Sequence, residues 1–532
     1  MTRTLFIGLD GATFSILDPL IGDSEGNQPT MPFLRHLIDN GVRAKLLSTP
    51  NPLTPQAWVS LMTGRMPGHH GVFDFLHAEE KDDEVYFTLS DARNIRTETL
   101  WSIASRQDRR VISLNLPITA PPRPVNGAIV PGFVPWKHLR RNVTPVELFE
   151  RLKSVPGFDA KRLAWDFEKE SQVMEEFTQE QLEDWVRYHV GREEQWARIS
   201  EKLLVEDEPD LMAVMFDGMD KIQHQAWPFL DPLLLATQSS PSTRRIVDLC
   251  REYFRNVDRY IERLVTLAGP QAQVFLASDH GFTSSTHAVR INTLLHDLGY
   301  LRWRLANDSD PERRREQSWF ANLDWKRTVA YCRTPSSNGI TIRVAQAPGA
   351  TGISPPEYES FRDHLIAQLR EVRDEETGEP IFQQIHKREE VFRGQAMKDA
   401  PDLLMVCRDH GFMSIRNARP IIEKRKLPIG THHPDGIFVA FGNGIVKGLT
   451  IERRRIVDTT SILLYSLGLP VPNDLEGEVP QHIFSDDHLA RNPVRIGPST
   501  YSVEGSEVRG GEITDKEKQK IIDQLRMLGY ME

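Results

Sequence analysis

Residues 4–11 of the chain read TLFIGLDG, an unbroken apolar run that ends at Asp10 and Gly11. Such a run is typical of a strand that is buried on both faces of a parallel sheet and enters a turn at its carboxyl end. Similar runs follow at residues 110–115, 211–216, 274–278 and 437–441. Because helical patterns separate these runs, the sequence predicts an α/β fold around a mostly parallel sheet.

Acidic residues directly follow three of the predicted strands. They are Asp10 and Asp217, each before a Gly, and Asp279, which stands before His280 and a Gly. An Asp before Gly is often an ordinary turn residue, so Asp10 alone decides little. In an open α/β sheet, however, ligands bind beyond the carboxyl ends of the strands. Together the three residues therefore predict one ligand-binding edge.

Composition excludes several classes of protein. The 532 residues include 65 Lys and Arg against 75 Asp and Glu, whereas proteins that bind nucleic-acid backbones usually carry a basic excess. No apolar run approaches the roughly 20 residues that cross a membrane, and the start MTRTLFIG lacks a signal-peptide pattern. The cysteines Cys250, Cys332 and Cys407 are odd in number and widely spaced, as expected of reduced packing residues. We expect a cytoplasmic protein without dedicated nucleic-acid binding or a transmembrane segment. The sequence does not indicate its oligomeric state.

An Asp and a His with metal-ligand spacing occur in the stretch DGMDKIQHQAW. Asp220 and His224 stand four residues apart, so on a helix they share one face and could hold one ion together. A solvated pair is the alternative. Asp217, seven residues before His224, could face the same way.

Two further His-bearing turns are candidate metal sites. Asp279 and His280 share one tight turn before Gly281, and both residue types are common metal ligands. His432 and His433 adjoin in the loop GTHHPDG, where one of them could be a ligand. Simple solvation is the alternative for His432 and His433.

A hydroxyl stands at a predicted helix start in residues 50–75, PNPLTPQAWVSLMTGRMPGHHGVFDF. Thr54 precedes Pro55, and the helix would end at Gly64, so a plain N-cap is the simple interpretation. A nucleophile for phosphoryl transfer would also gain from this position, because exposed N–H groups stabilise anionic oxygens. Trp58 and His70 in the same stretch are weaker candidates for contacts to a substrate.

Taken in order, these segments resemble the alkaline phosphatase superfamily, specifically the microbial intracellular branch of its type I phosphodiesterase/nucleotide pyrophosphatase family. Further similar stretches are PITAPP at 117–122, GATGISPPEY at 349–358 and VDTTSILLYSLGLPVP at 457–472, so that the resemblance covers nearly the whole chain. The shared motifs fall on Asp10; Thr54 with Thr63-Gly64, Pro67 and His70-Gly71; Asp220 and His224; Asp279-His280-Gly281; and Gly430-Thr431-His432.

The resemblance implies an alkaline phosphatase-like three-layer sandwich with inserted cap regions and a site for two zinc ions, with manganese as the alternative metal. Two such ions can clamp the attacking and leaving oxygens of an in-line displacement. The implied activity is hydrolysis of a phosphodiester or pyrophosphate bond in a small phosphorylated substrate such as a nucleotide, through a phospho-threonine intermediate. The implied ligands are Asp220, His224 and His432 for one ion, and Asp10, Thr54, Asp279 and His280 for the other, with Thr54 as nucleophile.

The chain departs from its relatives next to Thr54. Nucleotide pyrophosphatases usually place Asn three residues after the nucleophile, where this chain has Ala57, and bacterial phosphomonoesterases place Arg where it has Pro55. The setting of a sulfatase nucleophile is also absent. We therefore favour diesters over monoesters as substrates. The alternatives are a phosphomonoesterase or phosphotransferase acting on a small metabolite and, outside the enzymes, a metal-binding scaffold without catalysis.

The remaining chain is predicted to add to the core. Residues 160–205 are charged and carry Trp at helical spacing, as in a helical cap, and residues 305–420 contain polar, Pro-rich and Gly-rich loops, as in a second insert. We expect these two blocks to determine specificity. The predicted parts are a core of 1–159, 206–304 and 421–490, a cap at 160–205, an insert at 305–420, and a linker with the amphipathic helix DKEKQKIIDQLRMLGY within 491–532.

Overall fold

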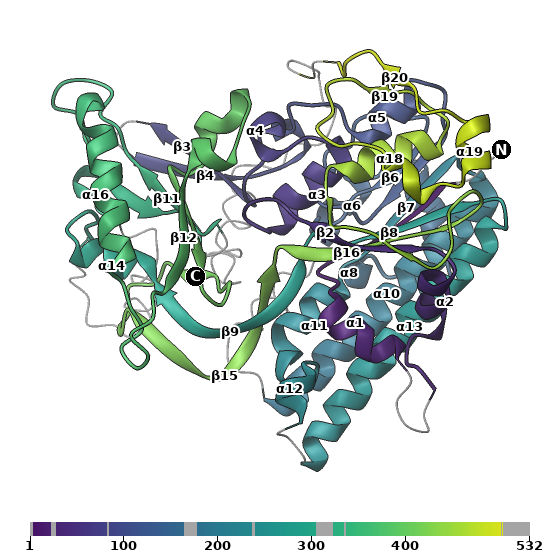
Figure 1. The fold of residues 1–532 in the computed structure, drawn as a ribbon, viewed down its shortest axis with the longest axis horizontal. Helices are drawn as coiled ribbons and strands as arrows, with labels where there is room; N and C mark the ends of the chain where they lie inside the picture. The colour runs from purple at the N-terminus through teal and green to yellow at the C-terminus, as the bar shows by residue number, and fades with distance from the viewer. Residues whose placement is uncertain are drawn as a thin grey trace.

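The computed structural model describes residues 4–22, 28–81, 84–163, 178–236, 240–304, 323–334, 337–501 and 503. A twisted central sheet runs through the larger part of the molecule (Figure 1). Within the described chain its order is β17-β2-β16-β8-β1-β7-β5-β6, with β18 beside β2. The strands are β1 (Thr4–Leu9), β2 (Val42–Leu47), β5 (Val111–Leu114), β6 (Gly127–Val130), β7 (Leu211–Phe216), β8 (Gln273–Ala277), β16 (Asp435–Gly442), β17 (Leu449–Thr450) and β18 (Arg454–Arg455).

The sheet is mostly parallel, as predicted. Strand β1 pairs in parallel with both β7 and β8, and β5 pairs in parallel with β6 and β7. The predicted run at 437–441 lies in β16, which is antiparallel to β8 and β2. No helix carries the chain back across the sheet before β16, because the chain returns to β16 directly from a long two-stranded ribbon.

Helices cover both faces of this sheet, which makes the three-layer sandwich. Successive side chains of β1 point to opposite faces: Leu5, Ile7 and Leu9 join one core cluster, and Phe6 joins the other. The first face carries α1 (Phe14–Ile21), α2 (Pro32–Asp39), α10 (Gln179–Asp207), α11 (Gly218–Ala226) and α13 (Pro241–Ala268). The second carries α3 (Thr54–Thr63), α5 (Leu100–Ser105) and α18 (Asp458–Ser466).

The range 160–205, predicted as a cap, lies in one of these layers. Its described part forms α8 (Ala160–Leu163) and most of α10, which packs along α13. Trp185 and Trp196 of α10 are 5% and 1% exposed within the same core cluster as β1. Because the Trp-bearing face of α10 is buried against the core, this helix belongs to the sandwich and does not stand beside it.

The range 305–420 contributes most of a smaller module with its own hydrophobic cluster (Figure 1, left). Its sheet has the order β10-β11-β13-β12, and α14 and α16 pack beside it. An antiparallel ribbon of β9 and β15, with β14 along β9, joins this module to the sandwich. The elements are β9 (Gly281–Arg290), α14 (Ile291–Asp297), β10 (Ala330–Cys332), β11 (Gly339–Ile342), α16 (Tyr358–Arg370), β12 (Phe382–Lys387), β13 (Leu403–Cys407), β14 (Met413–Ser414) and β15 (Ile422–His433).

Shorter elements complete the described chain. Cys250, Cys332 and Cys407 are buried free thiols, and no helix among the described residues is long and apolar enough to cross a membrane. The predicted amphipathic helix at 515–530 lies outside the described residues. The remaining elements are β3 (Leu76–Lys81), β4 (Glu84–Leu89), β19 (Val471–Pro472), β20 (Ile496–Gly497), α4 (Pro67–His70), α6 (Trp136–Leu139), α7 (Leu148–Leu152), α12 (Pro232–Leu235), α17 (Arg388–Val391) and α19 (Asp486–Arg491).

Candidate active site

The predicted ligands and the predicted nucleophile come together at the carboxyl edge of the sheet. One Asp follows β1, an Asp-His pair lies on α11 after β7, and a second Asp-His pair follows β8. A histidine near the end of β15 and the first residue of α3 complete the group. In chain order these residues are Asp10, Thr54, Asp220, His224, Asp279, His280 and His432.

The inner half of the cluster surrounds the imidazole of His280. Its Nε2 atom lies 3.3 Å from Thr54 Oγ1. The same nitrogen is 3.2 Å from Asp279 Oδ2 and 3.6 Å from Asp10 Oδ1. The Thr54 hydroxyl therefore faces a pocket of carboxylate oxygens and one ring nitrogen.

The outer half of the cluster surrounds Asp220. Its Oδ1 atom lies 3.1 Å from His432 Nε2 and 3.4 Å from His224 Nε2. His280 stacks on His432 with ring centroids 3.5 Å apart, and its Nε2 is 3.9 Å from Asp220 Oδ1. In the implied division of ligands His280 belongs to the inner ion, whereas here it lies between the two halves.

Backbone carbonyls fix which nitrogen each histidine presents to the cluster. The Nδ1–H groups of His224, His280 and His432 donate to the carbonyls of Gly430, Gly281 and Pro52, at 3.1, 3.1 and 2.7 Å. The Nε2 lone pairs then point into the cluster, as in metal-binding histidines. Gly430 makes one of these contacts possible, since a Cβ at that position would lie 2.2 Å from the backbone oxygen of Gln223.

The donor set fits divalent cations. Both carboxylate oxygens of Asp10 and Oδ2 of Asp279 are buried without a hydrogen-bond donor. The Nε2 atoms of His224 and His432 lie 3.0 Å apart, close enough for one cation to contact both. Carboxylates and imidazoles together suit zinc or manganese.

Burial and mutual proximity shift the acidities of these groups. Burial raises the pKa of Asp279 to about 8, and burial with the nearby Asp279 and Asp220 carboxylates raises the pKa of Asp10 well above its usual range. Burial also acts on Asp220, but its contacts with His224 and His432 hold its pKa well below the usual range. Burial lowers the pKa of His280, so that this imidazole is neutral at pH 7.

These shifts predict that metal affinity depends on pH. A ligand must lose its proton to bind, so metal uptake below pH 8 releases the proton held by Asp279. We expect the apparent zinc affinity of the metal-free protein to rise about tenfold per pH unit between pH 6 and pH 8 for each released proton. Calorimetric titration in buffers of different ionisation enthalpy measures both quantities. A constant affinity with no proton release would contradict this assignment of the ligands.

Asp217, the alternative to Asp220, lies in a different set of contacts. It pairs with the buried guanidinium of Arg192 and accepts a hydrogen bond of 3.3 Å from Asn115 Nδ2. It precedes α11, whose first residue is Gly218. This buried ion pair fixes the start of the helix that carries Asp220 and His224.

The start of α3 differs from the predicted cap. Leu53 is the N-cap residue, and Thr54 is the first helical residue with Pro55 after it. The hydroxyl of Thr54 is therefore not used as a cap and instead points to His280. The predicted end of the helix at Gly64 is confirmed, since Gly64 adopts a left-handed conformation with φ of 64°.

Trp58 and His70, the weaker candidates for substrate contacts, are both completely buried. Trp58 packs in the core beneath β1, where its buried ring cannot contact a substrate as predicted. His70 accepts from the Val72 N–H at 3.1 Å and lies 2.9 Å from Ser60 Oγ. Burial lowers the pKa of His70 to about 3, which makes it a neutral structural link.

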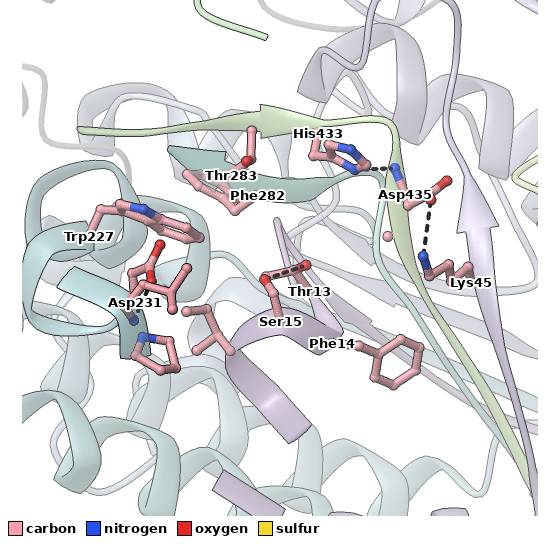
Figure 2. A pocket seen from close by; sticks show the side chains of 14 residues that line it. Thr13, Phe14, Ser15, Lys45, Trp227, Asp231, Phe282, Thr283, His433 and Asp435 are labelled. Carbon is pink, nitrogen blue, oxygen red and sulfur yellow. Dashed lines mark hydrogen bonds and ion pairs between the residues drawn. The ribbon is translucent and has the colours of Figure 1, made fainter. Parts of the chain in front are cut away.

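A pocket of about 420 Å³ lies beside the start of α1, where Thr13, Phe14 and Ser15 line it (Figure 2). Phe282 lines this pocket and also contacts the rings of His224 and His432, at 4.8 and 5.3 Å between centroids. His433 lines the pocket as well, whereas its neighbour His432 belongs to the cluster. Phe282 thus contacts the outer histidines and also lines this pocket.

Two residues close to the cluster were not identified from the sequence. The ammonium of Lys221 lies 3.9 Å from Asp220 Oδ2 and over the ring of Phe133, at 5.5 Å from its centroid. Phe412, which comes from the small module, lies 4.8 Å from His432 between ring centroids. A signal for Phe412 existed, because residues 409–412 repeat the Asp-His-Gly-Phe of residues 279–282.

Comparisons with known proteins agree with this architecture. The family model described as type I phosphodiesterase/nucleotide pyrophosphatase matches residues 4–435. No curated protein sequence matches the chain. The inactive variant of murine ectonucleotide pyrophosphatase/phosphodiesterase 5, solved with AMP, superimposes with a TM-score of 0.53 at 12% identity, over 91% of this chain and 100% of that one.

A second solved relative is phosphonoacetate hydrolase from Sinorhizobium meliloti 1021, in complex with phosphonoacetate. It is similar with a TM-score of 0.50 at 14% identity, over 88% of this chain and 95% of that one. Such low identities establish a shared fold, whereas the family match extends over most of the sequence. The chain therefore belongs to the type I phosphodiesterase/nucleotide pyrophosphatase family of the alkaline phosphatase superfamily. It is a hydrolase of phosphoester bonds and has candidate metal-site residues.

Proposed function

We propose that the protein hydrolyses phosphodiester or pyrophosphate bonds at a two-zinc site, with Thr54 as the nucleophile. The observation that carries this proposal is the position of the Thr54 hydroxyl, 3.3 Å from His280 Nε2. The same nitrogen lies 3.6 Å from Asp10 Oδ1, a buried carboxylate oxygen without a hydrogen-bond partner. Manganese is the alternative metal, because Asp and His ligands accept both ions. The murine relative that is similar in fold was made inactive by a threonine-to-alanine change, which supports a threonine in this role.

The residues of the chain divide into two ligand sets. We assign Asp10, Thr54, Asp279 and His280 to one ion and Asp220, His224 and His432 to the other. When bound, the ions would supply Lewis acidity and stabilise negative charge on the attacking and leaving oxygens.

The protein's own groups orient the attack. Thr54 lies at the start of α3, where backbone N–H groups can stabilise phosphoryl oxygens. Its hydroxyl is held beside a neutral imidazole, since burial keeps the pKa of His280 low. Attack of the Thr54 oxygen on phosphorus would break the bond to the leaving oxygen, which departs as an alcohol or a phosphate, and would leave the rest of the substrate bound to Thr54 through a phosphoryl group. Water would then cleave the bond between Thr54 and phosphorus and regenerate the free hydroxyl.

Diesters are expected to be better substrates than monoesters. A monoester dianion has one more charged oxygen to satisfy, and Pro55 and Ala57 offer it neither a cation nor a hydrogen-bond donor. His70 cannot supply the contact, because both its nitrogens are engaged in the core. We expect kcat/KM for an aryl phosphodiester to exceed that for the matching monoester by about 10-fold, roughly 1.4 kcal/mol.

Steady-state kinetics with the two esters of one leaving group, under metal-saturating conditions, checks this preference. A monoester preference would move the assignment to a phosphatase and would point to Lys221 as the extra cation. Lys221→Met then serves as the matched variant, because it keeps the length of the side chain and removes its charge. If the protein hydrolyses neither the two esters nor a pyrophosphate, the proposed function as a whole is contradicted.

A further inference from the structure

We infer that Phe412, from the small module, forms the wall against which the leaving group of the substrate packs, and that the enzyme prefers a flat aromatic leaving group. This inference rests on the proposed function and names the substrate class for the same site. The ring of Phe412 is half-buried and lies next to the rings of His432 and His224. Its centroid is 4.8 Å from that of His432 and 6.5 Å from that of His224.

This position lies on the open side of the cluster. The side chains of His280 and Asp10 are 0% and 1% exposed, whereas that of His224 is 21% exposed. Thr54 contacts the closed side through His280. In an in-line displacement the leaving group departs opposite to the nucleophile, so a group attacked by Thr54 would leave toward His224 and Phe412.

The loop that carries Phe412 is fixed to the ribbon on one side. Asp409 Oδ2 accepts the N–H groups of Thr286 and His287 in β9, at 2.7 and 3.0 Å. Thr431 of β15 donates its hydroxyl to the carbonyl of His410 at 3.1 Å. Burial opposes ionisation of Asp409, but the backbone N–H groups that it accepts lower its pKa, so these bonds are charge-assisted.

The same loop is fixed to the small module on its other side. The amide of Asn338 accepts from the N–H of Met413 at 3.0 Å and donates to the carbonyl of Gly411 at 3.4 Å, so that it holds both neighbours of Phe412. Asn338 and His410 adopt positive φ angles of 44° and 57°. Such backbone conformations cost energy and gather at functional sites. The ring of Phe412 is therefore held in place before any ligand binds.

An aromatic ring that is held in place and partly exposed favours a flat apolar partner. Ring pairs gain from offset or edge-to-face contact beyond the burial of area, and a rigid ring loses little conformational freedom on binding. Trp58 cannot take this role, because it is completely buried. The small module thereby contributes a specificity-determining residue to a site whose proposed ligands and nucleophile all come from the sandwich and the ribbon.

Binding of two phosphonates to the metal-replete protein tests this inference without relying on turnover. Phenylphosphonate carries a ring where an ester carries its leaving group, and methylphosphonate carries a methyl group there. We expect wild-type protein to bind phenylphosphonate about fivefold more tightly by calorimetric titration, and Phe412→Ala to bind both equally with unchanged affinity for methylphosphonate. Phe412→Tyr should keep the preference, and Phe412→Leu, which fills the same space, should lose most of it.

Phe361→Ala is the matched control, because Phe361 is a half-buried phenylalanine of the same module that packs on Tyr300. It should leave the ratio of the two affinities unchanged. An unchanged ratio in both Phe412→Ala and Phe412→Leu would overturn the inference while the proposed function stands. Loss of bound metal from Phe412→Leu would also overturn the inference, because the Phe412 ring would then be a structural support of the metal site. Failure of both phosphonates to bind wild-type protein would overturn the inference but not the proposed function, because both probes carry three charged oxygens, as the disfavoured monoesters do, and the ester kinetics test that function separately.

Discussion

Replacing Thr54 by Ala should leave a folded protein that keeps its metals and loses at least about 10³-fold in kcat/KM. An activated nucleophile and its electrostatic setting typically supply several kcal/mol of transition-state stabilisation. The fold should survive, because Leu53 and not Thr54 is the N-cap residue of α3, so that no capping bond is lost. Steady-state kinetics, together with elemental analysis of the same sample, checks the prediction.

Two variants of the same helix serve as controls. Thr54→Ser keeps a hydroxyl and should recover much of the lost rate. Thr63→Ala removes a hydroxyl that bonds the carbonyl of Val59 at 2.7 Å, so it should affect stability and leave the chemistry intact. Near-normal turnover in Thr54→Ala would instead indicate direct attack by water, with no covalent intermediate.

Replacing Asp220 by Asn should abolish most metal binding in the outer half of the cluster and reduce activity by at least about 10³-fold, since metal ligands hold the charge on which catalysis depends. Asp220 Oδ1 faces both His432 and His224, and the neutral amide cannot replace a carboxylate as a ligand. Elemental analysis should show about one ion lost per chain. Retained metal with retained activity would remove Asp220 from the ligand set.

Asp217→Asn is the matched control on the same turn. Asp217 pairs with Arg192, and both side chains are 4% exposed, so this variant leaves a buried guanidinium without its counter-ion. Such a change typically costs about 3–5 kcal/mol of stability. We expect a lower Tm with metal stoichiometry preserved at temperatures where the protein remains folded. Metal loss in Asp217→Asn equal to that in Asp220→Asn would reverse the assignment.

Sequence patterns within single strands, helices and turns predicted the parallel sheet and the placement of several candidate metal ligands. The apolar runs that precede Asp10 and Asp279 form adjacent parallel strands, because a run buried on both faces can lie only inside a covered sheet. The i, i+4 spacing of Asp220 and His224 placed both on one face of α11. The division of ligands between two ions came from the resemblance and stays a proposal.

Tertiary contacts decided what these patterns could not. The charged surface of residues 160–205 indicated a cap, but Trp185 and Trp196 bury one side of α10 in the core. Trp58 stands four residues after Thr54 and was expected beside a substrate, yet α3 turns it beneath β1. Phe412 reaches the cluster only because the ribbon of β9 and β15 brings the small module back to the sandwich.

Locating the bound ions shows whether these residues form a two-metal centre. Crystals of the zinc-replete protein, measured at the zinc absorption edge, would show them as anomalous difference peaks. We expect two peaks about 4 Å apart, one among Asp220, His224 and His432 and the other among Asp10, Thr54, Asp279 and His280. A map without a peak in the cluster, or with one ion that leaves Thr54 outside its ligands, would contradict this expectation.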